Sequence, residues 1–594
     1  MTARKVETVL PSALWRRVAP ALDLLCDTLA AERQKNFLLA CSFAIACIFC
    51  LWVFDVDFLL GTSPFWKNPR GIVGQGWYDI STALSGYDYF QRDNWQLPLF
   101  HTGKLGAPAG TNIIYTDSIP WVALAGRLLF RTTGVPVNLY GFWTVFCFIA
   151  SAITMTGLVA SLGQRNIAAA AMASIAGLCF PALLARWGHM SLMAQFEIPL
   201  ALIFYLQNRD CGKAWRFFGQ GAALMLLALW THTYLFAMVG AIVLVTLLQS
   251  LHNRASSMFS ATALLAGLTV FLGAAIVLSG HMETRGKLSA DGLGFYSMNL
   301  LSPFIPQHSG LYPSMRNVMI DGTGGQYEGF SYLGGGVMLL LILTLPWQWR
   351  TLKDGLRRNR WMLALFFGFT IFAVSNVVYL GPLRIFQLPL PASVAEFAAF
   401  FRSTGRFFWP VMYCLAALAI AAPISFYGRR AALLLCLAIP LQWIDSAPLR
   451  QALSASIRFP EKPHIDVDAW QKAIRRHNNI RVLPQFFCLA HNRGWNSETA
   501  VQLQLTAALA DRPINTVYAA RHAVDCRAER RMAEMQRPRT RQLSVFFDEF
   551  SGFSRMQVLA ETGGSCQAGP GLVVCSNAPE EAQNLRALVR TDRK

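Results

Sequence analysis

Apolar stretches about one bilayer long, separated by short polar gaps, run through the first 446 residues. A helix rises about 1.5 Å per residue, so roughly 20 apolar residues cross a hydrocarbon core of about 30 Å. The pattern predicts an all-α polytopic membrane region of about eleven spanning helices, resembling no soluble domain. The stretches lie at 37–54, 138–162, 167–185, 192–206, 217–231, 234–250, 258–279, 332–348, 361–380, 406–426 and 431–446.

Positive charge falls in alternate gaps between these stretches. The basic gaps hold Arg165, then Arg209, Lys213 and Arg216, then Arg254, then Arg350 to Arg360, then Arg429 and Arg430. By the positive-inside rule these gaps face the cytoplasm, as does the basic N-terminal segment 1–35. An odd number of spans then places the C-terminus outside, together with loops 55–137 and 280–331. The first apolar stretch is too long for a signal peptide and is interpreted as a retained anchor.

Composition supports a lipid environment. The chain of 594 residues is 54% hydrophobic and 14% charged, outside the range of soluble domains. Its formal net charge of +19 does not indicate nucleic-acid binding, because Lys and Arg are spread over short gaps and the tail instead of one basic face.

An ordinary globular pattern replaces the apolar one near Asp445, which predicts an extracytoplasmic α/β domain over 447–594. Helices are expected at 466–474 and at 497–505, the second opening on Ser497 as a cap, and strands at 479–484, 515–519, 542–547 and 571–575. Earlier in the chain, 118–130 is apolar but short and contains Pro120 and Arg127, so an interfacial or re-entrant helix is expected there.

Four of the thirteen cysteines lie in this outer tail, which suggests two disulfides in an oxidising compartment. Cys566 and Cys575 flank a Gly/Pro turn and are the favoured first pair, which leaves Cys488 and Cys526. The connectivity is one of three that four cysteines allow. The other cysteines fall mostly in apolar stretches as small buried side chains.

Carboxylates and aromatic rings concentrate in the first outer loop. A partly desolvated carboxylate has a raised pKa that suits a general base, and aromatic faces stack on sugar rings. The alternative is an interfacial aromatic belt with aspartates that cap turns and helices. The candidates are Asp55, Asp57, Trp77, Asp79, Asp88 and Asp117.

Polar residues elsewhere on the outer side could complete a site. Arg402 and Arg406 precede an apolar stretch, where guanidinium groups bind phosphate or serve as snorkelling anchors. His189 and His232 lie in very short outer turns and could face one cavity, and Glu197 needs a partner inside its apolar stretch. No metal-ligand spacing or phosphate-binding glycine loop appears. A divalent cation stays possible.

Several blocks together resemble a bacterial family of uncharacterised multispanning proteins, which in turn resembles the GT-C superfamily of polyprenyl-phosphate-dependent glycosyltransferases. The blocks are GWYD (76–79), GYDYF (86–90), WQLP (95–98), YTDSIP (115–120), RWGHMSL (186–192), NLLSPF (299–304), FSYLGGG (330–336) and FRSTGRFFWP (401–410).

This resemblance implies a bacterial inner-membrane enzyme with an outward-facing site. It implies a polyprenyl-phosphate sugar donor, a glycan or lipid acceptor, and an essential acidic residue in the first loop. Asp79 is the first choice because it lies in the most similar block, followed by Asp55 and Asp57. Many GT-C enzymes carry adjacent acidic residues after the first helix, where this chain has Asp-Val-Asp. The rivals are a transporter or flippase of lipid-linked or polysaccharide material and a non-catalytic envelope assembly protein.

Overall fold

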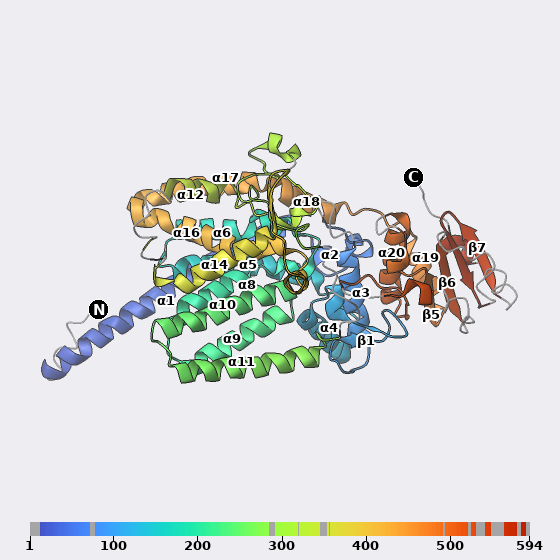
Figure 1. The fold of residues 1–594 in the computed structure, drawn as a ribbon, viewed down its shortest axis with the longest axis horizontal. Coiled ribbons are helices and arrows are strands. Elements are labelled where there is room, and N and C mark those ends of the chain that lie inside the picture. Colours follow the sequence, from blue (N-terminus) through green and yellow to red (C-terminus); the bar gives the residue numbers. More distant parts are fainter. Residues whose placement is uncertain are drawn as a thin grey trace.

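The computed structural model describes most of the chain. The described residues are 12–71, 78–283, 292–318, 320–344, 353, 355, 357–490, 494–520, 524–529, 541–547, 564–578 and 584–589. A bundle of helices forms one end of the molecule, a small sheet forms the other, and the first loop lies between them (Figure 1).

The bundle is built from the apolar stretches of the sequence. Among them α5 packs along α6, α1 along α5, and α12 along α17. The helices are α1 (Ser12–Val53), α5 (Tyr140–Ser161), α6 (Ile167–Leu178), α7 (Pro181–Leu184), α8 (Glu197–Asn208), α9 (Ala214–Leu229), α10 (Thr233–His252), α11 (Met258–Ser279), α12 (Gly335–Thr344), α14 (Arg360–Val374), α16 (Trp409–Tyr427), α17 (Ala431–Asp445) and α18 (Ala447–Arg458).

Six helical segments among the described residues are long and apolar enough to cross a membrane, and a seventh is added if α17 and α18, bent by 47°, form one span. The protein is therefore a multi-pass membrane protein. Each of the eleven expected stretches contains a helix, but α8, α9, α12 and α14 have only 10 to 16 residues. Some stretches include residues outside the α-helix, such as 192–196 before α8, so the eleven expected spans exceed the number of helices long enough to span among the described residues.

The first loop, after α1, folds into short helices and a two-stranded ribbon. It contains α2 (Val56–Leu59), η2 (Pro64–Lys67), α3 (Asp79–Arg92), β1 (His101–Thr102), β2 (Thr111–Asn112), η3 (Ile113–Thr116) and α4 (Pro120–Thr133). The expected short helix at 118–130 is α4, and Pro120 occupies its first turn, where the missing N–H costs nothing. Arg127 is fully buried on α4 and donates to the carbonyl of Phe90.

Short elements also connect the later membrane helices. They are η4 (Met190–Met193), η5 (Pro313–Asn317), η6 (Gln326–Gly329), the hairpin of β3 (Val377–Leu380) and β4 (Leu383–Gln387), α15 (Ala392–Ala399), η8 (Thr404–Phe408) and η9 (Gly428–Arg430). Among these, η6 and η8 pack together at the end of the bundle that faces the first loop. A Cβ on Gly405 would lie 2.5 Å from the Cα of Gly329, so this close packing requires glycine at position 405.

The chain beyond Phe459 forms a mixed sheet with helices. Strand β5 pairs parallel with β6, and β8 pairs antiparallel with both β6 and β7, in the order β5-β6-β8-β7. The elements are α19 (Val467–Arg475), β5 (Asn479–Leu483), η10 (Phe486–Cys488), α20 (Trp495–Leu509), β6 (Gln542–Phe547), β7 (Ser565–Gly569), β8 (Leu572–Ser576) and α23 (Leu585–Leu588).

Two local expectations for this region are wrong. Helix α20 begins at Trp495, so Ser497 is a buried residue of its first turn and no cap. The expected strand at 515–519 does not form; only Ile514 makes isolated bridges, to Leu105 and to Ile480. Asn515 instead pairs with Val482 of β5 through its side-chain amide, and the flanking Ile514 and Ala520 bond to the backbone of the first loop. The disulfides in the structure join Cys488 to Cys526 and Cys566 to Cys575.

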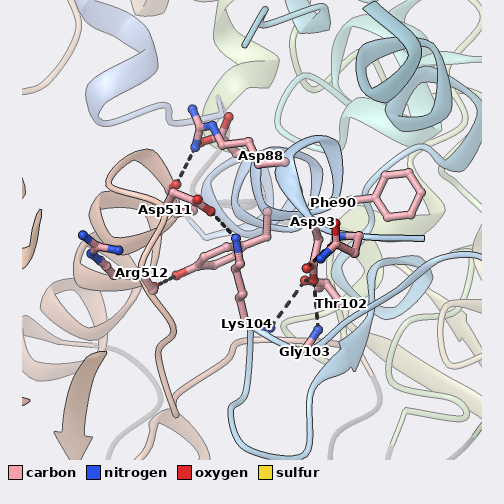
Figure 2. A network of polar contacts seen from close by, with 12 residues as sticks. Asp88, Phe90, Asp93, Thr102, Gly103, Lys104, Asp511 and Arg512 are labelled. Carbon is pink, nitrogen blue, oxygen red and sulfur yellow. Dashed lines mark hydrogen bonds and ion pairs between the residues drawn. The ribbon is translucent and has the colours of Figure 1, made fainter. Parts of the chain in front are cut away.

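Helix α3 of the first loop packs directly on α20. The hydroxyl of Tyr89 donates to the carbonyl of Arg512 at 2.6 Å, and Lys104 forms an ion pair with Asp511 at 2.7 Å. Figure 2 shows this junction with Asp88 beside it. The C-terminal region is thus anchored to the first loop by both apolar packing and charged contacts.

Candidate functional site

Four side chains from separate segments that connect or begin helices converge at the start of α3. The Nδ1 atom of His189 lies 3.0 Å from Oδ2 of Asp79, and Nε2 of His232 lies 3.5 Å from Oδ1 of Asp117. One atom each from Asp79, Asp117 and His189 lies within 4.8 Å of the other two. These four residues are called the carboxylate–histidine cluster below.

Local structure explains why these residues meet. Asp79 is the first residue of α3, and Asp117 ends η3 in a left-handed conformation that aspartate tolerates. A Cβ on Gly86 would lie 2.3 Å from Oγ1 of Thr116, so glycine lets α3 press against the turn that carries Asp117. His189 immediately precedes η4, and His232 caps α10 by accepting from the N–H of Tyr234.

A second group of charges lies beside the cluster. Glu328 of η6 accepts from Arg186, in a very short contact, and from Nε of Arg406 at 2.9 Å. Arg186 also donates to the carbonyl of Tyr327 at 2.9 Å, and the guanidinium of Arg406 stacks 4.7 Å from the ring centre of Tyr234. The triad of Arg186, Glu328 and Arg406 is buried, with two positive charges and one negative charge.

Burial and neighbouring charges set the protonation of the cluster. Burial raises the pKa of Asp79 above its ordinary value, with Asp117 and Glu328 adding to the rise and His189 opposing it. Burial also favours a raised pKa for Asp117, but the hydrogen bond and charge of His232, with further help from His189, outweigh it and lower the pKa. The two aspartates therefore differ, and Asp79 is the one whose carboxylate more readily takes up a proton.

Burial and neighbouring charges also shift the pKa values of His189 and Glu328. Burial lowers the pKa of His189, which leaves its imidazole neutral at neutral pH. Burial opposes the charge of Glu328, but Arg186 and Arg406 more than compensate and hold the pKa of Glu328 below its ordinary value. A neutral imidazole between two carboxylates can accept a proton, orient a carboxylate or bind a metal ion.

The donor set of the cluster fits a divalent cation. Two carboxylates and one neutral imidazole are oxygen and nitrogen ligands of the kind that Zn²⁺ and Mn²⁺ accept. The sequence shows no metal-ligand spacing because Asp79, Asp117 and His189 come from three separate elements. Only the folded chain brings their ligand atoms within 4.8 Å of one another.

The remaining candidates from the sequence have other surroundings. Asp55 is exposed and caps α2 by accepting from the N–H of Phe58 at 2.7 Å, and Asp57, also exposed, accepts from the hydroxyl of Thr62. The structure thus places both in local turn contacts and not in the cluster. Trp77 lies outside the described residues.

Three further candidates also lie outside the cluster. Asp88 is buried and forms an ion pair with Arg92 at 2.8 Å. The guanidinium of Arg402 lies 4.8 Å from the ring centre of Tyr296 and is not bound to Glu328. Glu197 is buried and accepts from the hydroxyl of Thr231.

Three residues of the site were not selected from the sequence. Arg186 belongs to the block at 186–192, in which only His189 was a candidate. Glu328 lies two residues before the block at 330–336. Tyr518, which lowers the pKa of Asp79, lies in a segment expected to be a strand. Arg186 and Glu328 could have been predicted because they lie in or next to a block that resembles the family. Nothing in the sequence pointed to Tyr518.

Two family models match this chain, one over the helix bundle and one over the C-terminal region. A family model described as "Domain of unknown function (DUF6311)" matches residues 43–447, and one described as "DUF6311 C-terminal domain" matches residues 469–577. No curated protein matches the chain. A crystal structure of ArnT from Cupriavidus metallidurans in the apo state aligns over 92% of this chain and 99% of its own, with 14% identity and a TM-score of 0.41. The match over residues 43–447, more than half of the chain, shows that this protein belongs to the DUF6311 family.

Proposed function

We propose that this protein is an inner-membrane glycosyltransferase that moves a sugar from a polyprenyl-phosphate donor to a glycan or lipid acceptor on the outer face of the membrane. The observation that carries the proposal is the contact of Asp79 with His189 at 3.0 Å, with Asp117 beside them and two buried arginines next to the cluster. A carboxylate of raised pKa beside fixed positive charge suits base catalysis with an anionic leaving group.

The proposed reaction is a single displacement. Asp79 takes the proton of the acceptor hydroxyl, the hydroxyl oxygen attacks the anomeric carbon, and the bond from that carbon to the phosphate oxygen breaks. The polyprenyl phosphate departs with the electron pair, and the configuration at the anomeric carbon inverts. His189 holds the Asp79 carboxylate, and His232 holds Asp117 in its ionised form.

Arg406 and Arg186 are the proposed source of positive charge for the phosphate. Their single shared partner, Glu328, leaves the triad with a net charge of +1 when all three are ionised. Arg402, on the same loop as Arg406, would add a second contact from the outer side. In an alternative form of the site, Asp79, Asp117 and His189 would instead hold a divalent cation, which would stabilise the phosphate charge and take the place of the Asp79–His189 contact.

The proposed topology follows from the same arrangement. The N-terminal segment is cytoplasmic, residues 36–446 form the membrane domain, and residues 447–594 form a periplasmic α/β domain. The first loop, which carries Asp79 and Asp117, and the C-terminal region both lie at one end of the helix bundle (Figure 1). This placement favours chemistry at the membrane surface over a transport path through the bilayer.

The test is sugar transfer in proteoliposomes that contain the full-length protein. Wild type is supplied with a panel of polyprenyl-phosphate sugars and envelope extract as acceptor source, with and without EDTA followed by Mn²⁺. Acceptor-dependent release of polyprenyl phosphate, with an inverted glycosidic product, is expected. Movement of an intact lipid-linked sugar across the bilayer without transfer would support a flippase instead. Neither transfer nor movement, with a folded protein, would favour an assembly role.

A further inference from the structure

Residues 514–520 of the C-terminal region run along the first loop. The N–H of Ile514 donates to the carbonyl of Lys104 at 2.9 Å, and the N–H of Ala520 donates to the carbonyl of Tyr115 at 2.6 Å. Tyr115 lies two residues before Asp117 of the cluster. The segment is therefore fixed by its backbone to the loop that supplies the aspartates.

Tyr518 lies in this segment and is held by a closed set of hydrogen bonds. Its N–H donates to Oε1 of Gln504 at 2.9 Å, the amide of Gln504 donates to the hydroxyl of Thr82 at 2.9 Å, and that hydroxyl donates to the carbonyl of Tyr518. Thr82 follows Asp79 by three residues, so both lie on the same face of α3. The ring of Tyr518 packs edge-on against Tyr78, with centroids 5.6 Å apart.

Tyr518 is thereby held beside the first turn of α3, where its hydroxyl lowers the pKa of Asp79 and the charge of Asp79 raises the pKa of Tyr518. The charged and titratable groups that face Asp79 are His189, Asp117, Glu328 and Tyr518. Of these, Tyr518 alone comes from the C-terminal region. The site described above is thus shared between the membrane region and the C-terminal region.

We propose that Tyr518 is a positioning residue that, together with His189, fixes the orientation of the Asp79 side chain, so that the C-terminal region completes the active site. The proposal rests on the proposed function for its catalytic meaning. Two partners from different regions hold one carboxylate, so its direction depends on the docking of the C-terminal region onto α3. Loss of the hydroxyl frees the carboxylate to rotate while the ring continues to fill its space.

The test compares Tyr518→Phe with Tyr89→Phe in full-length protein. Both variants remove one hydroxyl from the junction of α3 and the C-terminal region, but Tyr89 donates to the carbonyl of Arg512, at the other end of α3 (Figure 2). A hydrogen bond to a charged group corresponds to roughly a 10- to 100-fold effect. Tyr518→Phe is expected to lower kcat for sugar transfer by that factor with donor KM within about twofold, and Tyr89→Phe is expected to leave kcat within about twofold.

Hydrogen exchange followed by mass spectrometry gives a second measurement that needs no substrate. Faster exchange in the first turns of α3 is expected for Tyr518→Phe, and faster exchange only near Arg92 for Tyr89→Phe. If wild type transfers no sugar but exchange responds in this way, the proposed function fails and the positioning role of Tyr518 stands. Equal kcat losses in both variants, or unchanged kcat and exchange in Tyr518→Phe, would overturn the inference.

Discussion

The turn after α1 and the start of α3 both carry aspartates of the first loop, but these aspartates have opposite environments. Asp55 and Asp57 are exposed and make short-range contacts within their own turn. Asp79 and Asp117 lie beside histidines from two distant turns, and their exposed side-chain fractions are 14% and 27%. Long-range partners and desolvation, more than residue type or position in the loop, distinguish a reactive carboxylate from a structural one.

The two pairs of aspartates also differ in the positively charged side chains near them. Among the described residues no cation forms an ion pair with Asp55 or Asp57, whereas the cluster lies beside Glu328 and its partners Arg186 and Arg406. A buried charge is stable only when its partners stay in place. The cluster therefore depends on residues separated by more than 200 positions in the chain, and the turn after α1 depends on its nearest neighbours.

Removing the negative charge from the buried triad of Arg186, Glu328 and Arg406 is expected to have the largest effect on stability. Glu328→Gln leaves two buried guanidinium groups without an anionic partner, which costs about 3–5 kcal/mol of unfolding free energy. Denaturation in mixed detergent micelles measures it. The control is Glu283→Gln, which removes a more exposed carboxylate 3.6 Å from His101 and should change stability by less than about 1 kcal/mol. Similar losses in both variants would contradict the account of the triad.

Asp88 of the same loop is buried but lies outside the carboxylate–histidine cluster, so it shows the effect of burial by itself. Burial, only partly offset by Arg92, raises the pKa of Asp88 to about 6 from an ordinary value of 3.8. Between these pH values the folded protein holds a proton that the unfolded chain has lost, so Asp88 makes stability fall as pH rises. The total loss is about 3 kcal/mol and is complete above about pH 6.

Asp88→Asn removes this titration. The difference in unfolding free energy between the variant and wild type is expected to grow in favour of the variant from about pH 4 to pH 6 and then to stay constant. Sugar transfer by the variant is expected to stay near the wild-type rate, because Asp88 makes its contacts with Gln91 and Arg92. A pH-independent difference would refute the raised pKa of Asp88.

Replacing the exposed Asp55 is expected to have the smallest effect on the free energy of unfolding. Asp55→Ala removes the side-chain cap of α2, which typically costs about 1 kcal/mol. Asp55→Asn keeps a capping acceptor and should cost less. Neither change is expected to alter sugar transfer, and a large loss of transfer in Asp55→Asn with a folded protein would return Asp55 to the list of candidate bases.

Much of the architecture follows from local patterns. Each apolar stretch contains a helix, α4 lies where a short amphipathic helix was expected, and β5, β6 and β8 lie at or within one residue of the expected strands. The number of spans was harder to predict, because hydropathy does not show where a helix such as α8 begins. Segment 515–519 has the composition of a strand, yet Asn515 meets β5 through its side-chain amide, and the neighbouring Ile514 and Ala520 bond to the first loop.

Most residues of the site could be predicted from the sequence, but the contacts between them could not. Asp79, Asp117, His189 and His232 were all selected as polar residues in outer segments. Their distances depend on how α3, η3, η4 and α10 pack, which no local pattern encodes. Glu328 and Tyr518 became visible only through the partners that the fold brings to them, because a single glutamate or tyrosine in a loop has no distinguishing spacing.

The most direct test of the central claim compares sugar transfer by wild type, Asp79→Asn and Asp55→Asn in matched proteoliposomes. Replacing a general base costs about 10²- to 10⁴-fold, so Asp79→Asn is expected to lose transfer by such a factor while it stays folded and binds the donor. Asp55→Asn is expected to transfer sugar at the wild-type rate. Equal rates in all three proteins, or a loss confined to Asp55→Asn, would contradict the assignment of Asp79 as the base.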